Sequence, residues 1–105
     1  MQEVFMNLIN NAIDAMGSAG GSLEIRSRVE GDQVVVDVAD TGHGMAKTVM
    51  ARIFDPFYTT KPAGQGTGLG LSICYGIIKK LRGSLTVDST VGVGTTFHVH
   101  IPIRT

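Results

Sequence analysis

The chain carries, at residues 64–72, the stretch Gly-Gln-Gly-Thr-Gly-Leu-Gly-Leu-Ser, with glycine at every second position from 64 to 70. Glycine takes positive φ readily and lets another backbone or a ligand approach closely. The four alternating glycines predict a flexible loop, whereas Leu69, Leu71 and Ile73 commit the following residues to a core. We therefore expect a loop that runs into a buried helix, whose first N–H groups and positive dipole end favour an anion.

Two common phosphate-binding motifs do not fit this stretch. A P-loop needs Gly-x-x-x-x-Gly-Lys-Ser/Thr, and no lysine follows a glycine here at that distance. The dinucleotide fingerprint Gly-x-Gly-x-x-Gly fails because Leu71 stands where its last glycine would be if the motif began at Gly66. An ordinary surface loop remains an alternative for such a segment taken alone, so the other motifs must decide.

The composition is typical of one small globular domain. The 105 residues are 43% hydrophobic and 17% charged, which excludes a disordered chain. The formal net charge is zero, so no electrostatic argument favours nucleic acid or an anionic membrane as a partner. A single cysteine, Cys74, excludes an internal disulfide and a cysteine zinc cluster, and we expect it to fill the core of a protein in a reducing compartment.

An amphipathic helix is predicted near the start of the chain, and Gly17 ends it. Its apolar residues have helical spacing and are Phe5, Leu8, Ile9, Ala12, Ile13 and Met16. A polar stripe on another face consists of Glu3, Asn7, Asn11 and Asp14, with Asn10 beside it. Asparagine costs roughly 0.5 kcal/mol relative to Ala or Leu in a helix, because its amide competes for the backbone. Three asparagines in five positions favour a row of amides that faces a ligand, with a solvated polar face as the alternative.

A hairpin is predicted over residues 23–40, with its turn at Gly31 and Asp32. The first strand alternates Leu23, Ile25 and Val29 with Glu24, Arg26 and Arg28, so we expect one apolar and one solvated face. In the second strand, Asp40 shares a face with Val34, Val36 and Val38, so its carboxylate points inward and needs hydrogen-bond donors. The glycines at 42 and 44 that follow would let a ligand lie against the backbone. The alternative is an aspartate that opens an ordinary glycine turn.

The second half of the chain predicts a short helix over 46–54, a movable segment over 58–63, a helix that Gly83 closes and a second hairpin. Phe54 and Phe57 flank a proline, and we expect them to anchor the base of the movable segment. The last strand points Thr95, Phe97, Val99 and Ile101 inward and His98 and His100 toward solvent. His43 has no neighbouring base partner and receives no catalytic role. The order of elements predicts an α+β two-layer sandwich.

Five motifs occur in a fixed order along nearly the whole chain. They are Asn-Leu-Ile-Asn-Asn-Ala-Ile-Asp-Ala-Met at 7–16, Asp-Thr-Gly-His-Gly-Met at 40–45, Phe-Asp-Pro-Phe at 54–57, Gly-Thr-Gly-Leu-Gly-Leu at 66–71 and Gly-Val-Gly-Thr-Thr-Phe at 92–97. Together they closely resemble the N, G1, F and G2 boxes and the last glycine-threonine motif of the catalytic, ATP-binding domain of sensor histidine kinases, above all its nitrogen- and oxygen-sensing branch. The resemblance implies the Bergerat (GHKL) fold: a mixed, mostly antiparallel sheet, three helices on one face and a flexible ATP lid.

The resemblance also implies roles for individual residues. Asn11 matches the asparagine that binds Mg²⁺, and Asn7 matches the amide one turn earlier, near the phosphates. Asp40 matches the acid that accepts from the adenine amino group, which agrees with its inward direction. Further contacts with ATP are implied for Gly42, Gly44, Lys61, Gly66, Thr67, Gly68, Leu69, Gly70 and Thr95. Asn7, Asn11 and Lys61 are the implied catalytic residues, and Arg52 is a weaker phosphate contact.

Two departures from the family pattern bear on the reaction. Many members carry Lys and Tyr where this chain has Asp14 and Ala15, so that phosphate contact is absent. Relatives that hydrolyse ATP or phosphorylate serine have a glutamate where this chain has Asn7, and an amide cannot take a proton from water or a hydroxyl. A neutral histidine needs no such base, so we expect transfer to a histidine on phosphoacceptor helices encoded before Met1.

The implied ligands and partners follow from this assignment. They are ATP or ADP, Mg²⁺, the histidine phosphoacceptor helices of the same kinase and, indirectly, a response regulator, with no nucleic acid and no membrane contact by this domain. We expect residues 1–105 to form one domain, monomeric as a fragment and part of a homodimeric kinase, located in the cytoplasm or on the cytoplasmic side of a membrane-anchored sensor. The alternatives are an ATP-hydrolysing or serine-phosphorylating relative and a non-catalytic nucleotide-binding interaction module.

Overall fold

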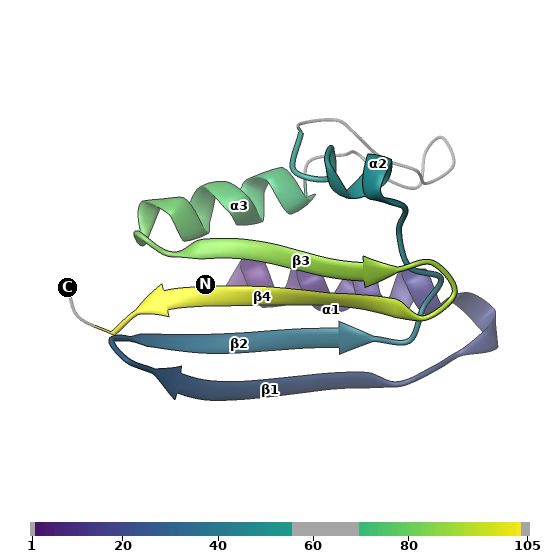
Figure 1. The fold of residues 1–105 in the computed structure, drawn as a ribbon, viewed down its shortest axis with the longest axis horizontal. Coiled ribbons are helices and arrows are strands. Elements are labelled where there is room, and N and C mark those ends of the chain that lie inside the picture. The colour runs from purple at the N-terminus through teal and green to yellow at the C-terminus, as the bar shows by residue number, and fades with distance from the viewer. Residues whose placement is uncertain (1, 56–69, 104–105) are drawn as a thin grey trace.

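The computed structural model describes residues 2–55 and 70–103, and Figure 1 shows their arrangement. The elements in chain order are α1 (Gln2–Met16), the 3₁₀ turn η1 (Gly17–Ala19), β1 (Leu23–Glu30), β2 (Gln33–Asp40), α2 (Lys47–Met50), α3 (Gly70–Lys80), β3 (Ser84–Thr90) and β4 (Gly94–Pro102). The four strands form a sheet, and helices cover one of its faces. The predicted α+β two-layer sandwich is confirmed.

The sheet has the strand order β1-β2-β4-β3, and each of its three pairings is antiparallel. The two hairpins therefore meet through β2 and β4, which lie side by side in the centre although they are far apart in the sequence (Figure 1). The register pairs Val38 with Phe97 and Asp40 with Thr95. The end of β2 and the start of β4 thus bring two polar residues together at one end of the sheet.

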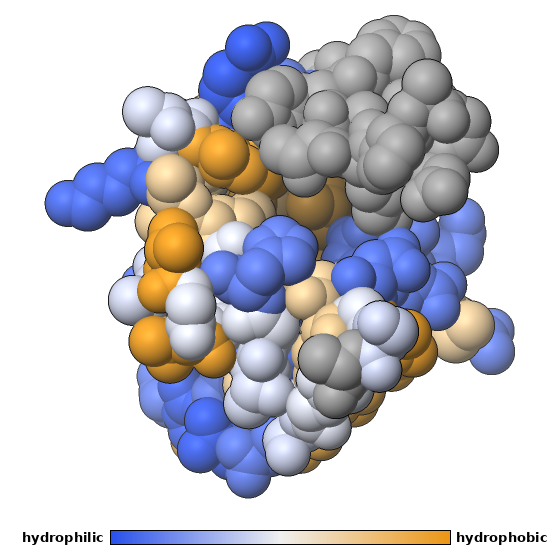
Figure 2. Space-filling view, turned by 90° about the vertical axis from the view of Figure 1, so that its right-hand side faces the viewer, coloured by the Kyte–Doolittle hydropathy of each residue, from blue (hydrophilic) through white to orange (hydrophobic). Residues whose placement is uncertain are grey.

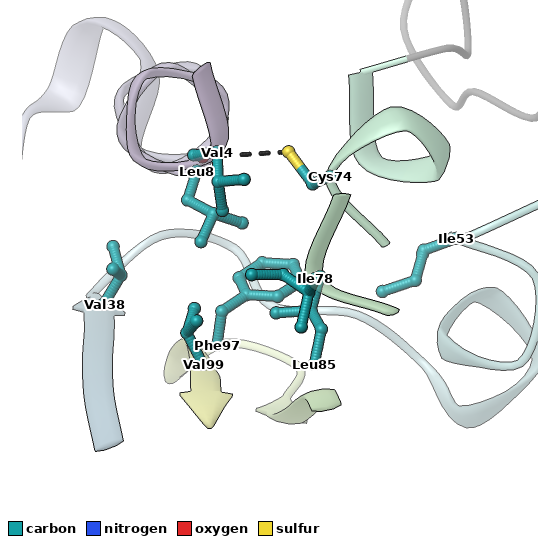
Figure 3. Close-up of a cluster of buried hydrophobic side chains, with 9 residues drawn as sticks. All are labelled: Val4, Leu8, Val38, Ile53, Cys74, Ile78, Leu85, Phe97 and Val99. Carbon is teal, nitrogen blue, oxygen red and sulfur yellow. Dashed lines mark hydrogen bonds between the residues drawn. The ribbon is translucent and has the colours of Figure 1, made fainter. Parts of the chain in front are cut away.

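The core lies between the sheet and the helices α1 and α3 (Figure 3). Its buried side chains are Val4, Leu8, Val38, Ile53, Cys74, Ile78, Leu85, Phe97 and Val99. The predicted inward faces of β2 and β4 are confirmed, since Val38, Phe97 and Val99 belong to this cluster. Cys74 is a core residue as expected, and burial raises the pKa of its thiol, so the sulfur stays protonated at neutral pH.

The buried stripe of α1 is narrower than the predicted one and includes Val4, which the prediction left out. It consists of Val4, Leu8 and Ala12, while Ile13 is 54% exposed. The helix packs against both β2 and α3, and residues about one turn apart lie on the single face that points between these two elements. Gly17 follows the last residue of the helix with a φ of +59°, a left-handed conformation that confirms the predicted helix end.

The strand β1 is exposed along its whole length, so the prediction of one apolar, covered face was wrong. Leu23, Ile25 and Val29 are 37%, 50% and 68% exposed. The reason is the position of β1 at the edge of the sheet: α1 packs over β2, and α3 packs over β3 and β4. Whether a helix extends over an edge strand depends on the tertiary fold, and the alternation of residues within the strand does not predict it.

The boundaries of α2 and α3 also differ from expectation. The helix α2 has four residues, and turns continue to Asp55. At the end of α3 the left-handed residue is Arg82, with a φ of +62°, and not Gly83. Gly83 is needed for close approach, because a Cβ there would lie 2.1 Å from the carbonyl oxygen of His100. Phe54 is half-buried against the core and stacks on Tyr75, while Phe57 and the segment 58–63 lie outside the described residues.

The helix-free face of the sheet carries an ion-pair network that crosses all four strands. Asp37 on β2 accepts from Nη1 of Arg28 on β1 at 2.7 Å and contacts Nδ1 of His98 on β4 at 2.7 Å. Nε2 of His98 lies 2.8 Å from a carboxylate oxygen of Asp88 on β3. His98 points away from the helices, as predicted, but its side chain is only 23% exposed and pairs with the buried Asp37, so the expectation that it is open to solvent was wrong. The side chains of neighbouring strands cover this face where no helix does.

None of the helices within residues 2–55 and 70–103 is both long and apolar enough to cross a membrane.

Candidate functional site

The polar residues singled out by the sequence gather where β2 ends and β4 begins. In Figure 1 the last turn of α1 and the turn between β3 and β4 lie at this same end of the molecule. Asp40 and Thr95 are direct partners in the sheet and face the helical side, as the alternation predicted. Directly opposite residues of an antiparallel pair have Cβ atoms roughly 5 Å apart, so their polar atoms can act on one group.

The carboxylate of Asp40 is half-buried and only partly used. Its Oδ1 accepts a hydrogen bond from the backbone N–H of Gly42 at 2.8 Å. Its other oxygen, Oδ2, accepts none from any residue within 2–55 or 70–103. A half-buried carboxylate needs donors, and because no residue within 2–55 or 70–103 serves its second oxygen, that oxygen can accept from a ligand.

The loop that follows Asp40 is held by backbone hydrogen bonds to three other segments. The N–H of Thr41 donates to the carbonyl of Ser22 at 3.2 Å, and the N–H of His43 donates to the carbonyl of Ala15, in the last turn of α1, at 3.2 Å. The N–H of Gly92, in the turn between β3 and β4, donates to the carbonyl of His43 at 2.8 Å. Backbone hydrogen bonds therefore tie the loop both to α1 and to the second hairpin.

The two glycines of this loop are required by the packing of the protein itself. A Cβ at Gly42 would lie 2.7 Å from the carbonyl carbon and oxygen of Ala15. Gly44 has a φ of +73°, and a Cβ there would lie 2.1 Å from the carbonyl oxygen of Thr90. Protein backbone thus occupies the space that we expected a ligand to use beside these Cα atoms. A contact of Gly42 or Gly44 with ATP through their peptide groups stays a prediction.

The asparagine row lies on α1 beside the first turn of α3. Nδ2 of Asn7 donates to the carbonyl of Glu3 at 3.0 Å, and a Cβ at Gly70 would be 3.2 Å from Oδ1 of Asn7. The amide oxygen of Asn7 therefore borders the start of α3, where a side chain at position 70 would crowd it. Asn11, one turn further along α1, is half-buried and makes no hydrogen bond to the described residues, so its amide can accept a ligand.

Sequence reasoning missed Ser89, whose side-chain hydroxyl connects three segments at this end of the sheet. Its Oγ lies 2.7 Å from the backbone N of Met45, 3.1 Å from the carbonyl oxygen of Gly94 and 2.8 Å from Oγ1 of Thr95. Thr95 itself is 5% exposed. The signal was present in the alternation of β3, because Ser89 continues the inward row of Leu85 and Val87, as Asp40 continues the row of valines on β2.

Several predicted contact residues are not brought to this site by the described part of the chain. Lys61, Gly66, Thr67, Gly68 and Leu69 lie outside the described residues, whereas Gly70, the first residue of α3, lies beside Asn7. Arg52 follows α2, where its guanidinium forms an ion pair with Asp55 at 3.3 Å. Within residues 2–55 and 70–103, no three His, Cys, Asp or Glu side chains form a metal site, so a cation here would depend on amide oxygens and on its other ligands.

Figure 2 faces this end of the molecule. Hydrophilic residues gather across the middle of the view, and apolar residues lie on its left flank. The exposed apolar side chains at this end include Val91 and Val93 in the turn between β3 and β4, which are 66% and 67% exposed. This end of the molecule thus exposes apolar side chains together with polar ones.

Comparison with known proteins gives one consistent result. Residues 1–105 match the family model described as histidine kinase-, DNA gyrase B- and HSP90-like ATPase. Sensor kinase CckA of Brucella abortus is 45% identical over 96% of this chain, and sporulation kinase E of Bacillus subtilis is 38% identical over 99% of it. The chain spans only 12% and 14% of the lengths of these two relatives.

Solved structures agree with this result. The catalytic domain of histidine kinase ThkA superposes with a TM-score of 0.83 at 38% identity, over 96% of this chain and 64% of that domain. Full-length ShkA in complex with AMPPNP superposes with a TM-score of 0.84 at 30% identity, over 96% of this chain and 21% of ShkA.

Proposed function

The chain belongs to the family of histidine kinase-, DNA gyrase B- and HSP90-like ATPases, and we propose that it binds Mg·ATP and donates the γ-phosphate to a histidine of a two-component sensor kinase. The observation that carries the proposal is the half-buried carboxylate of Asp40 beside Thr95, in which one oxygen accepts a hydrogen bond from the described residues and the other accepts none. Its oxygen Oδ2 would accept a hydrogen bond from the adenine amino group. The AMPPNP in the complex of the structural relative ShkA is an analogue of the same nucleotide.

The asparagine row supports the phosphate end of the site. Mg²⁺ prefers oxygen ligands and keeps several waters, so the Asn11 amide oxygen together with phosphate oxygens would hold it, and the cation would neutralise phosphate charge. The half-buried Asn11 amide, which has no partner among residues 2–55 and 70–103, fits this role. Asn7, beside the start of α3, would orient the phosphates, joined by the predicted contacts of Lys61 and residues 66–70.

The acceptor class follows from what Asn7 cannot do. An amide does not take a proton, so a water or a serine hydroxyl would lack a base at this position. A neutral imidazole already has a free lone pair on one ring nitrogen, so it can attack the γ-phosphate without help from a base. Phosphoryl transfer depends mainly on positioning and charge neutralisation, which the asparagine row and a bound cation would supply. The acceptor would be a histidine on separate phosphoacceptor helices, in a homodimeric kinase whose signal passes to a response regulator in the cytoplasm.

A transfer assay tests the proposal. The chain is mixed with phosphoacceptor helices of the matched sensor kinases and with ATP labelled at the γ-phosphate. We expect label on protein that is lost in acid and retained in base, as phosphohistidine is. Phosphate on serine, or steady release of phosphate without the acceptor helices, would show that the chain belongs to a hydrolytic or serine-directed branch of the family instead.

A further inference from the structure

Ser89 has a fixed pattern of donors and acceptors that its three neighbours impose. A serine hydroxyl has one proton and two lone pairs. The backbone N–H of Met45, 2.7 Å away, can only donate, and the carbonyl oxygen of Gly94, 3.1 Å away, can only accept. Ser89 therefore gives its single proton to Gly94 and uses one lone pair for Met45. Its remaining lone pair faces Oγ1 of Thr95 at 2.8 Å.

This pattern determines the direction of the Thr95 hydroxyl. When Ser89 gives its proton to Gly94, its contact with Thr95 is a hydrogen bond only if the O–H of Thr95 donates, so the arrangement that satisfies all three contacts has Thr95 as the donor. Thr95 is 5% exposed, so its hydroxyl has little water with which to form another arrangement. With its proton directed at Ser89, Oγ1 of Thr95 can act only as an acceptor toward any other group. Directly across the strand pair, Asp40 also presents an acceptor, its Oδ2.

We infer that Ser89 is a positioning residue that makes the base end of the site a two-acceptor site, selective for a purine with a 6-amino group over one with a 6-oxo group. An amino group has two N–H donors for the oxygens of Asp40 and Thr95, whereas a carbonyl oxygen at the same place would meet two acceptors and no donor. A site built to bind a donor rejects an analogue that lacks it, because the buried groups are left unpaired. This inference rests on the proposed binding of ATP.

The test compares the affinities of the chain for ATP and for ITP, which has an oxygen in place of the 6-amino group, by calorimetry. We expect ATP to bind more tightly than ITP by about 10-fold or more, since one or two hydrogen bonds are lost and unpaired acceptors remain. Ser89→Ala should lower this ratio about 3- to 10-fold, because the Thr95 hydroxyl becomes free to turn and donate. Thr95→Val, which removes the hydroxyl but keeps the shape, should lower it to a similar extent.

A double-mutant cycle separates positioning from structural damage. If Ser89 acts through Thr95, then Ser89→Ala should change the ATP to ITP ratio less than about 2-fold in a Thr95→Val background, because effects on one shared group are not additive. Multiplicative effects of the two substitutions would overturn the inference. If Ser89→Ala does not fold, an unchanged ratio in a folded Thr95→Val would overturn it equally. A parent chain that binds neither nucleotide would instead refute the proposed function.

Discussion

Replacement of His98 by glutamine tests the ion-pair network on the helix-free face. Each ring nitrogen of His98 lies within 2.8 Å of a carboxylate oxygen, Nδ1 at Asp37 and Nε2 at Asp88. A neutral imidazole can donate to only one of them, so both contacts are favourable only when the ring is protonated. Burial alone lowers the pKa of His98, but the hydrogen bonds to Asp37 and Asp88 and the two carboxylate charges outweigh it, and the pKa is raised from 6.5.

The sign and size of the effect follow from this geometry. A raised folded-state pKa means that the stabilisation by His98 is complete below pH 6.5 and is lost as pH rises through the folded-state value. The bond to the buried Asp37 is charged on both sides and contributes about 2 kcal/mol, while Asp88 is 84% exposed and adds at most about 0.5 kcal/mol. His98→Gln should therefore lower the free energy of unfolding by about 2 kcal/mol at pH 5.5 and by less than about 0.5 kcal/mol at pH 8.5.

Urea denaturation at pH 5.5, 7 and 8.5 measures this difference, provided that the m-value stays constant. His100→Gln is the matched control, because His100 lies on the same strand and face and forms no ion pair within the described residues. Its effect on the free energy of unfolding should not follow the pH course of the His98→Gln difference. A His98→Gln difference that is the same at all three pH values would refute the argument that the folded sheet holds a protonated ring.

Three further predictions concern the candidate site. Asp40→Asn should weaken ATP binding by about 1.5–3 kcal/mol, the contribution of a hydrogen bond to a charged group, and calorimetry that finds unchanged affinity would remove Asp40 from the base site. Asn11→Ala should reduce the gain in ATP affinity that Mg²⁺ produces. If the parent binds ATP with the same affinity with and without Mg²⁺, the assignment of Asn11 as a Mg²⁺ ligand is wrong. Gly44→Ala should destabilise the fold by roughly 2 kcal/mol or more, since its φ is +73° and a Cβ would meet the carbonyl of Thr90, whereas Gly76→Ala, in open space within α3, should stabilise it by about 0.5–1 kcal/mol in urea denaturation. Equal effects of the two glycine substitutions would contradict the role given to close packing at Gly44.

The inward rows of the central strands could be predicted from the sequence because they depend only on a period of two residues. Val38, Phe97 and Val99 are buried as expected, and Asp40 and Thr95 end up on the same face. What the alternation does not contain is the order of strands. That order makes β1 an exposed edge, and it places β4 beside β2, which brings Thr95 and its partner Ser89 next to Asp40.

The helix-free face illustrates a second limit. Val35 is completely buried although it points away from the helices, and Asp37 on the same face is 5% exposed. They are covered by side chains of β1 and β4, the neighbours of β2, and long charged residues bury area along their stems. Hydropathy places arginine and histidine side chains in solvent. A sheet face that these side chains cover is therefore predicted, wrongly, to be exposed.

The strand β2 carries two carboxylates, and the number of hydrogen-bond partners that each has distinguishes a structural role from a ligand-binding role. Asp37 has partners on both oxygens, and these hydrogen bonds outweigh the effect of burial, so its pKa is lowered from 3.8 and its stabilisation is lost only as pH falls through that lowered value. Asp40, three residues later and on the opposite face, has a donor from the described part of the chain on only one oxygen. A buried or half-buried polar group that the fold satisfies holds strands together, whereas one that the fold leaves half-satisfied in a fixed place is ready for a ligand. The assignment of Asp40 to the base site therefore depends on this unused oxygen, more than on its position at the end of a strand.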